Sequence, residues 1–271
     1  MLRDRRDGLL AYRFETLPDQ LDAFVSTRHG GVSPPPYDSL NLGLRVGDED
    51  ERVVENRRRL CRAFGIELER SVWCRQIHAD GVAVVGDADA GRGSTEEDSI
   101  VKDADALVTD APGLALCVTL ADCVPVAIFD PEHRVVGLAH AGWGGTVARI
   151  SSRTVEVMRE GFGCRPESLV AAIGPSIGAA GYEVGADVIE VAGAAYGERA
   201  SELLQPREDG KALFDLWAAN RIDLEGAGVL AERIEVASMS TAEHRQDFYS
   251  YRAEGVTGRF ACVVALRPLR R

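Results

Sequence analysis

The residues best suited to chemistry in this chain are one cysteine and one histidine. The cysteine lies within an apolar run, and the histidine directly follows the next apolar run along the chain. Cys123 lies within the apolar run 117–129, and His140 directly follows a second run at 134–139. A thiolate and an imidazole are ordinary ligands of a transition-metal ion, and the same pair can act as a nucleophile and its base. The sequence therefore predicts either a metal site or a catalytic cysteine at these two residues.

The segment between the two apolar runs predicts a β-hairpin. Residues 130–133 include aspartate and proline, which β-turns favour. If Asp130 pairs with His133, Cys123 lies directly opposite His140. Directly opposed residues share a face, with Cβ atoms roughly 4.5–5.5 Å apart. The hairpin would thus bring both side chains within reach of one metal ion.

His78 is the candidate for a third ligand, because it follows a short strand expected at 71–75. Three protein ligands and an open fourth position are typical of catalytic zinc, whereas structural zinc usually has four protein ligands. The chain contains no Cys-x-x-Cys pair that would complete a structural site. Asp122 is a candidate general base, although a regular strand would direct it away from Cys123.

Two glycine-containing motifs have weaker chemical interpretations. Residues 174–178 match the Gly-x-Ser-x-Gly pattern of a serine nucleophile, but Gly178 and Gly181 oppose the helix that this motif requires. The glycines at 142–145 precede a helix, where they favour either an anion site or only a tight turn. The chain has no P-loop and no Gly-x-Gly-x-x-Gly fingerprint, which argues against triphosphatases and dinucleotide-binding enzymes.

The elements that must position these residues alternate between strand and helix patterns. There is no internal repeat and no evident linker, so we expect one mixed α/β domain over residues 1–271. Helices are expected at 49–64, 147–161, 184–195 and 214–227. Strands are expected at 9–15, 21–26, 71–75, 82–85, 104–109, 117–129, 134–139, 169–173, 234–238 and 260–266.

Composition and charge exclude several classes of partner. The net charge of −12 argues against binding to nucleic acid or to an anionic membrane surface. The N-terminus has no apolar segment of signal-peptide length, and the longest apolar run is too short to cross a bilayer. The 6 cysteines are scattered, which is typical of reduced thiols. We expect a cytoplasmic protein.

A series of short motifs covers nearly the whole chain, at 28–33, 39–43, 76–78, 105–109, 121–125, 140–143, 174–177, 182–184, 248–252 and 257–259. In this order the motifs resemble the YfiH-like or laccase-domain proteins, a family also called multicopper polyphenol oxidoreductases and purine nucleoside phosphorylases. The resemblance implies a single-domain α/β/β/α layered sandwich with mixed sheets. It also implies a zinc site formed by His78, Cys123 and His140.

The resemblance further implies a purine nucleoside phosphorylase, in which phosphate displaces the base of adenosine, inosine or guanosine. Adenosine deamination at the same centre is also implied, with a water attacking at the open zinc position. The partners would be a small nucleoside and phosphate, while the oligomeric state stays open. Guanidinium binds phosphate in a bidentate geometry. The candidate contacts to phosphate and ribose are Arg28, Asn41, Arg57, Arg252 and Arg259. Each of these residues is equally suited to a structural role.

The sequence leaves three alternatives open: an editing hydrolase for peptidoglycan precursors, a copper polyphenol oxidase, and a non-catalytic metal-binding protein. The chain also departs from the family pattern, which usually has arginine where Gly144 stands and often has cysteine at Gly181 and Ser240. Thiolates are the soft ligands that Cu(I) prefers, so the missing cysteines weaken the copper interpretation. We expect the site to differ from the family at Gly144.

Overall fold

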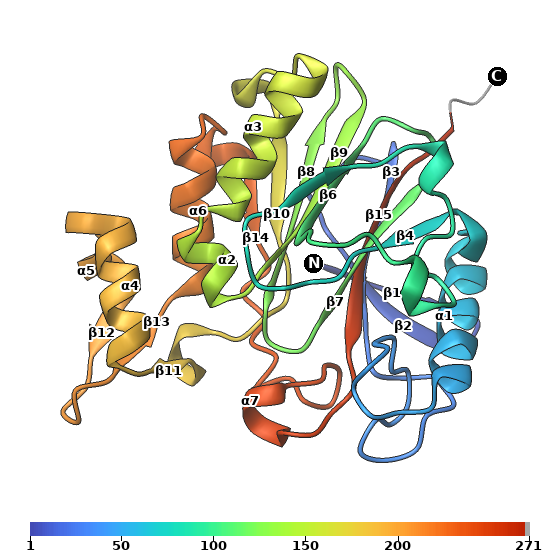
Figure 1. The fold of residues 1–271 in the computed structure, drawn as a ribbon, viewed down its shortest axis with the longest axis horizontal. Coiled ribbons are helices and arrows are strands. Elements are labelled where there is room, and N and C mark those ends of the chain that lie inside the picture. Colours follow the sequence, from blue (N-terminus) through green and yellow to red (C-terminus); the bar gives the residue numbers. More distant parts are fainter. Residues whose placement is uncertain (269–271) are drawn as a thin grey trace.

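The computed structural model describes residues 1–268 and contains two large β-sheets that lie face to face, with helices on both outer faces (Figure 1). Within this range the first sheet is six-stranded, in the order β1-β2-β3-β15-β7-β4. Its neighbouring strands are antiparallel, except that β4 runs parallel to β7. Their bounds are Leu2–Arg6 (β1), Leu9–Arg13 (β2), Leu21–Ser26 (β3), Phe260–Leu266 (β15), Ala115–Leu120 (β7) and Ser71–Trp73 (β4).

The second sheet is also six-stranded within residues 1–268, in the order β14-β10-β8-β9-β6-β5. Its two edge strands run parallel to their neighbours, and the inner pairs are antiparallel. The strands are Ile234–Val236 (β14), Val170–Ile173 (β10), Val124–Asp130 (β8), Val135–Ala141 (β9), Ala106–Thr109 (β6) and Val82–Val84 (β5).

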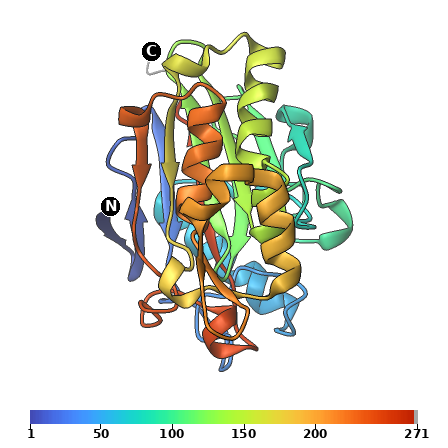
Figure 2. The same cartoon turned by 90° about the vertical axis from the view of Figure 1, so that its left-hand side faces the viewer.

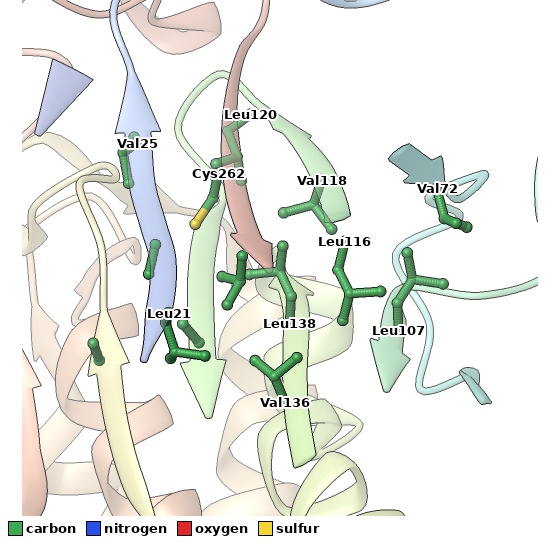
Figure 3. Close-up of a cluster of buried hydrophobic side chains, with 14 of the residues drawn as sticks. Leu21, Val25, Val72, Leu107, Leu116, Val118, Leu120, Val136, Leu138 and Cys262 are labelled. Carbon is green, nitrogen blue, oxygen red and sulfur yellow. The ribbon is translucent and has the colours of Figure 1, made fainter. Parts of the chain in front are cut away.

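Three layers of buried apolar side chains separate the four layers of backbone. Figure 3 shows the central one, in which Leu116 and Val118 of the first sheet meet Leu107 and Leu138 of the second. Successive residues of a strand point to opposite faces, so Cys117 of β7 packs outward instead, toward the helix on that side. The expected α/β/β/α sandwich of mixed sheets is confirmed.

The helix α1, Asp50–Phe64, covers the outer face of the first sheet. Its apolar residues Leu60 and Phe64 recur near the helical period and are buried. Gly65 ends the helix with a φ of 72°, a left-handed conformation that glycine adopts without strain. The prediction of a helix at 49–64 with Gly65 as its stop is therefore confirmed.

The outer face of the second sheet carries most of the remaining helices, as the view in Figure 2 makes clear. The helix expected at 147–161 begins at Ile150 instead, because Arg149 adopts a left-handed φ of 64° and separates it from a short helix at 143–147. A small sheet of β11, β13 and β12 was not expected at all. The helices are Trp143–Val147 (α2), Ile150–Phe162 (α3), Ala186–Tyr196 (α4), Ala200–Leu203 (α5), Leu216–Gly226 (α6) and Tyr251–Glu254 (α7), and the small strands are Glu183–Val184 (β11), Leu204–Pro206 (β12) and Ala212–Phe214 (β13).

The apolar run 117–129 is not the single strand that its composition predicts. It forms β7 in one sheet and β8 in the other, and the chain crosses between them at Asp122, whose φ is 90°. The expected register of the following hairpin is also wrong by two residues, since His140 pairs with Pro125 and not with Cys123. A shift of two residues keeps the same face, so Cys123 and His140 still share one.

None of the helices within residues 1–268 combines the length and the apolar character that a membrane crossing requires.

Candidate active site

His78, Cys123 and His140 meet at one end of the space between the two large sheets. Their ligand atoms all lie within 4.8 Å of one another. The Sγ atom of Cys123 is 3.8 Å from Nε2 of His78, and the two imidazole rings meet edge to face with centroids 4.9 Å apart. His140 is buried and His78 is exposed, so the group extends from the interior to the surface. These residues form a candidate metal-binding group.

The turn that carries His78 is wrapped around a buried carboxylate, Asp105. Asp105 accepts hydrogen bonds from the backbone N–H groups of Ile77, His78 and Ala79 at 3.1, 2.9 and 2.9 Å. His78 has a φ of 62°, which these three bonds help to hold in the left-handed region. The carboxylate thus fixes the backbone that presents the imidazole.

Asp105 also orients the second histidine. Its Oδ1 lies 2.9 Å from Nδ1 of His140, so that ring nitrogen is engaged and Nε2 is left for the cysteine and a metal. Burial opposes ionisation of Asp105, but the hydrogen bonds from His140 and from the amides of Ala79 and His78 hold its pKa below the ordinary value. The group is therefore an anion that serves both histidines.

Gln76 aligns the segment just before the turn with the end of β7. Its side chain donates to the carbonyl of Thr119 at 2.7 Å and accepts from the N–H of Thr119 at 2.8 Å. These two bonds continue the pairing of β4 with β7 by means of a side chain in place of a backbone. The position of His78 thus depends on the first sheet through Gln76, and on the second sheet through Asp105, which directly precedes β6.

Cys123 and His140 stabilise each other's charged forms. Burial by itself would raise the pKa of Cys123, but the charge of His140 and hydrogen bonds from His140 and His78 lower it to about 6. Burial likewise opposes protonation of His140, whereas the thiolate of Cys123 and the carboxylate of Asp105 raise its pKa to about 9. The sulfur is therefore a thiolate at neutral pH, which is the form that binds metals and attacks electrophiles.

Two glycines make room for the three side chains. A Cβ atom at Gly142 would lie 2.6 Å from Cδ2 of His78 and 3.1 Å from Sγ of Cys123. At Gly144, where the sequence departs from the family pattern, a Cβ atom would lie 2.6 Å from the carbonyl oxygen of His78. A larger residue at position 144 would therefore require the His78 turn to lie elsewhere.

The three residues line a cavity of about 580 Å³, which is large enough for a small organic substrate. Its lining includes the aromatic residues Trp73 and Tyr251, and Tyr251 of α7 is 60% exposed at the surface. Four arginines and one glutamate, among the residues of 1–268, also line it: Arg45, Arg57, Arg75, Arg259 and Glu97. The cavity is therefore basic although the whole chain is acidic.

Of the five predicted substrate contacts, Arg57 and Arg259 line this cavity. Arg57 is buried with its guanidinium 3.7 Å from the centre of the Trp73 ring. Burial lowers the pKa of Arg57 to about 10, so it stays charged at neutral pH. Burial also lowers the pKa of Arg259, while nearby Cys123 and Asp122 oppose this change.

The other three predicted contacts, Arg28, Asn41 and Arg252, do not line the cavity. Arg28 forms ion pairs with Glu254 at 2.8 Å and Asp38 at 3.6 Å. Asn41 is buried and accepts the backbone N–H of Arg259 at 2.8 Å. Arg252 donates to the carbonyl of Glu183 at 2.7 Å. Each of these side chains joins segments that are distant in the sequence.

Asp122, the predicted general base, uses both carboxylate oxygens in structural hydrogen bonds. They accept from the hydroxyl of Thr241 and from the backbone N–H of Arg252, both at 2.6 Å. Asp122 is buried at the crossing between β7 and β8 and does not line the cavity. It thereby fixes the start of α7, which carries Tyr251.

Asp105, Arg45, Arg75 and Glu97 belong to the site but are not among the residues that the sequence predicts for it. Asp105 had a signal, because it is an acidic residue between alanines at the start of an apolar strand. Arg45 and Glu97 lie in segments without a helix or strand pattern, and Arg75 ends the short strand expected at 71–75, so the sequence offers no signal to distinguish these three residues. Their place in the cavity follows only from the packing of those segments.

Two other groups of reactive side chains have structural explanations. Ser176 of the Gly-x-Ser-x-Gly motif is fully buried and bonds to Gly174 and Trp217, so a serine nucleophile is not supported. Asp130, His133 and Cys164 also lie close together. There the carboxylate caps the backbone N–H of His133 at 3.0 Å and lies 2.9 Å from its ring Nδ1, as in a hydrogen-bonded turn.

The chain is similar in sequence and in fold to several known proteins. The family model described as multi-copper polyphenol oxidoreductase laccase matches residues 22–267. A purine nucleoside phosphorylase of Deinococcus radiodurans is 43% identical over 243 residues, covering 89% of this chain and 87% of that protein. The protein named adenosine deaminase RL5, from an unknown prokaryotic organism, is 36% identical, with coverage of 87% and 90%. The crystal structure of YlmD from Geobacillus stearothermophilus superposes with a TM-score of 0.93 at 35% identity, covering 98% of each chain.

Proposed function

This chain belongs to the multi-copper polyphenol oxidoreductase laccase family, and we propose that it is a zinc-dependent purine nucleoside phosphorylase that also deaminates adenosine. The observation that carries this proposal is the position of the three ligand residues on the wall of a basic cavity. The purine nucleoside phosphorylases among the relatives support the same reaction class.

The donor set fits a zinc ion. Two imidazole nitrogens and one thiolate are ordinary zinc ligands, and three of them leave a fourth position for a substrate or water. Asp105 supplies the outer carboxylate that usually orients a ligand histidine. A single thiolate favours Cu(I) less strongly than a sulfur-rich site would. When bound, zinc would act there as a Lewis acid toward an oxygen atom.

Phosphorolysis requires that the rest of the cavity bind two substrates, a phosphate and a nucleoside. A phosphate oxygen forms a bond to C1′ of the ribose while the bond from C1′ to the purine nitrogen breaks, and the purine leaves with the electron pair. The enzyme must therefore hold a phosphate anion beside a neutral nucleoside. The arginine-lined wall supplies positive charge for the anion, and Trp73 and Tyr251 supply aromatic surface for a planar base.

Adenosine deamination is the second activity that we propose, because the protein named adenosine deaminase RL5 aligns with most of the chain. In that reaction water adds to C6 of the purine and ammonia leaves. The same cavity would bind adenosine with C6, in place of C1′, next to the three ligand residues. The two reactions then differ in how the nucleoside is oriented.

Purified protein provides the test. We expect about one zinc per chain by elemental analysis, and formation of ribose 1-phosphate from inosine and inorganic phosphate. Both should be lost in Cys123→Ala and in His78→Ala, and retained in His29→Ala. His29 is an exposed histidine that does not line the cavity, so it is a matched control.

Specific results would overturn the proposal. Stoichiometric copper in place of zinc would favour an oxidase. Activity on a muramyl-peptide precursor without activity on nucleosides would favour peptidoglycan editing. Full zinc content in His78→Ala would show that the ligand set is different from the one proposed.

A further inference from the structure

The four arginines of the cavity differ in what their guanidinium groups contact. Arg57 donates to the backbone carbonyls of three residues, at 2.5 to 3.1 Å. Arg259 donates to two further carbonyls, both at 2.9 Å. Nε and Nη1 of Arg57 and Nη1 of Arg259 are therefore used to hold backbone segments in place.

Arg45 and Arg75 instead converge on one carboxylate, that of Glu97. Nε of Arg45 contacts one carboxylate oxygen, and Nη2 of Arg75 lies 3.5 Å from the other. Nε of Arg75 is buried and has no hydrogen-bond partner within residues 1–268. Glu97 is also the one carboxylate among the described residues that line the cavity. Two arginines thus share a single anion and retain unused donor capacity.

The backbone around Glu97 is held independently of this contact. The Oγ of Ser99 accepts the N–H of Gly93 at 3.0 Å, and the carbonyl of Ser99 accepts Nε of Arg92 at 3.0 Å. The N–H of Ile100 donates to the carbonyl of Glu97 at 3.0 Å. Rotation of the Glu97 side chain alone would therefore release both arginines without disturbing the turn.

We propose that Arg45 and Arg75 form a phosphate subsite, and that the carboxylate of Glu97 fills this subsite until phosphate displaces it. A carboxylate and a phosphate make the same kind of charge-assisted, bidentate hydrogen bond with guanidinium. Phosphate has more acceptor oxygens than a carboxylate, and one of them would satisfy Nε of Arg75. Glu97 is then an internal competitor that sets the affinity for phosphate.

The choice of phosphate as the anion rests on the proposed phosphorylase function. The exchange of the Glu97 carboxylate for phosphate depends on charge, and a measurement of phosphate binding tests it without catalysis. Phosphate must break the two ion pairs of Glu97 in order to bind. Because these pairs are partly exposed, removing the competing charge should tighten phosphate binding by roughly three- to tenfold.

The equilibrium test is a calorimetric titration of the purified, metal-containing protein with inorganic phosphate at constant ionic strength. Glu97→Gln keeps the shape of the side chain and should tighten the Kd for phosphate by that factor. Arg75→Gln should weaken the Kd by about tenfold or more, since a charged hydrogen bond is lost. Asp98→Asn removes the same charge from the exposed neighbouring residue and should leave the Kd unchanged within about twofold.

Kinetics provide the second measurement. In phosphorolysis of inosine, Glu97→Gln should lower the KM for phosphate by the same factor and leave the KM for inosine unchanged. An unchanged Kd for phosphate in either Glu97→Gln or Arg75→Gln would overturn the subsite. A change confined to the KM for inosine would do so as well, because Glu97 would then contact the nucleoside.

These experiments distinguish a failure of the proposed phosphate subsite from a failure of the proposed phosphorylase function. If phosphate binds with the expected pattern but nucleosides are not cleaved, the subsite stands and the phosphorylase function falls. If inosine is cleaved but these variants leave phosphate binding unchanged, the phosphorylase function stands and the subsite is wrong.

Discussion

Oδ1 of Asp105 lies 2.9 Å from Nδ1 of His140, and the same atom accepts the backbone N–H of His78 at 2.9 Å. One buried carboxylate therefore orients one candidate ligand through its side chain and another through its backbone. The geometry of the three-residue group depends on this contact as much as on the ligands themselves.

Asp105→Asn should weaken zinc binding by roughly 10- to 100-fold, the usual effect of losing an outer carboxylate. The amide keeps the size of the side chain but loses the charge that supports His140. Competition with a chromophoric chelator measures the affinity. Asp110→Asn, at an exposed position just after β6, should bind zinc as the wild type does. Equal affinity in both variants would contradict the role given to Asp105.

Gly142→Ala should disrupt the metal-binding group without unfolding the protein, because the new methyl group would overlap His78 and Cys123. We expect a loss of zinc content, measured on the purified variant. Gly161→Ala is the matched control in α3, where a Cβ atom meets nothing within 4 Å. That change should retain zinc and stabilise the protein by about 0.5–1 kcal/mol. Full zinc content in Gly142→Ala would contradict the observed packing.

Arg57→Lys should lower the free energy of unfolding by about 2–4 kcal/mol, since an ammonium cannot reproduce the three carbonyl contacts and the stacking on Trp73. Urea denaturation measures the change. Arg58→Lys, at the next position with a side chain 58% exposed, should change stability by less than about 0.5 kcal/mol. A stable Arg57→Lys variant with impaired phosphate binding would shift Arg57 from a structural role to a substrate contact.

Asp223 should make stability depend on pH in the acidic range. Burial raises its pKa to about 6, although Arg149 and Tyr196 oppose this shift. An unfolded carboxyl group titrates near pH 4, at about 3.9. Between these values the folded chain holds a proton that the unfolded chain lacks. The contribution of Asp223 to the free energy of unfolding therefore falls as the pH rises from about 4 to about 6, and stays constant above.

Asp223→Asn removes this titration. Urea denaturation of both proteins at several pH values between 4 and 7 gives the difference in their free energies of unfolding. Relative to the variant, the wild type should lose on the order of 1–3 kcal/mol across the window. Parallel pH profiles for the two proteins would show that Asp223 has an ordinary pKa.

Removal of metal should expose Cys123 as the most reactive thiol. The pKa of Cys123 is about 6, whereas burial raises the pKa of Cys61 and Cys164 to about 12. Metal-free protein should react with iodoacetamide at Cys123 at neutral pH, and the rate should fall as the pH drops below about 6. Added zinc should protect the thiol. A rate that rises only above pH 8 would show that His140 does not support the thiolate. Peptide mass analysis identifies the modified residue.

Local patterns were sufficient for much of the architecture. The helix α1 has apolar residues at the helical period and a glycine at its end, and both signals depend only on nearby residues. The run 117–129 was predicted as one strand but forms two, because apolar composition indicates that a segment is buried and does not indicate in which sheet it lies. The wrong hairpin register still placed Cys123 and His140 on one face, since an error of two residues preserves the alternation of side chains.

The sequence by itself determined the donor chemistry of the candidate site, which is two imidazoles and one thiolate. It also indicated that these groups meet at the hairpin formed by the two apolar runs. These are properties of residue types and of local periodicity. Only the tertiary structure decided which arginines reach the cavity. Arg28 and Arg252 bond to partners more than 60 positions away, while Arg45 and Arg75 meet Glu97 at the cavity wall. The direction of a long charged side chain is set by such distant contacts, and no local pattern encodes them.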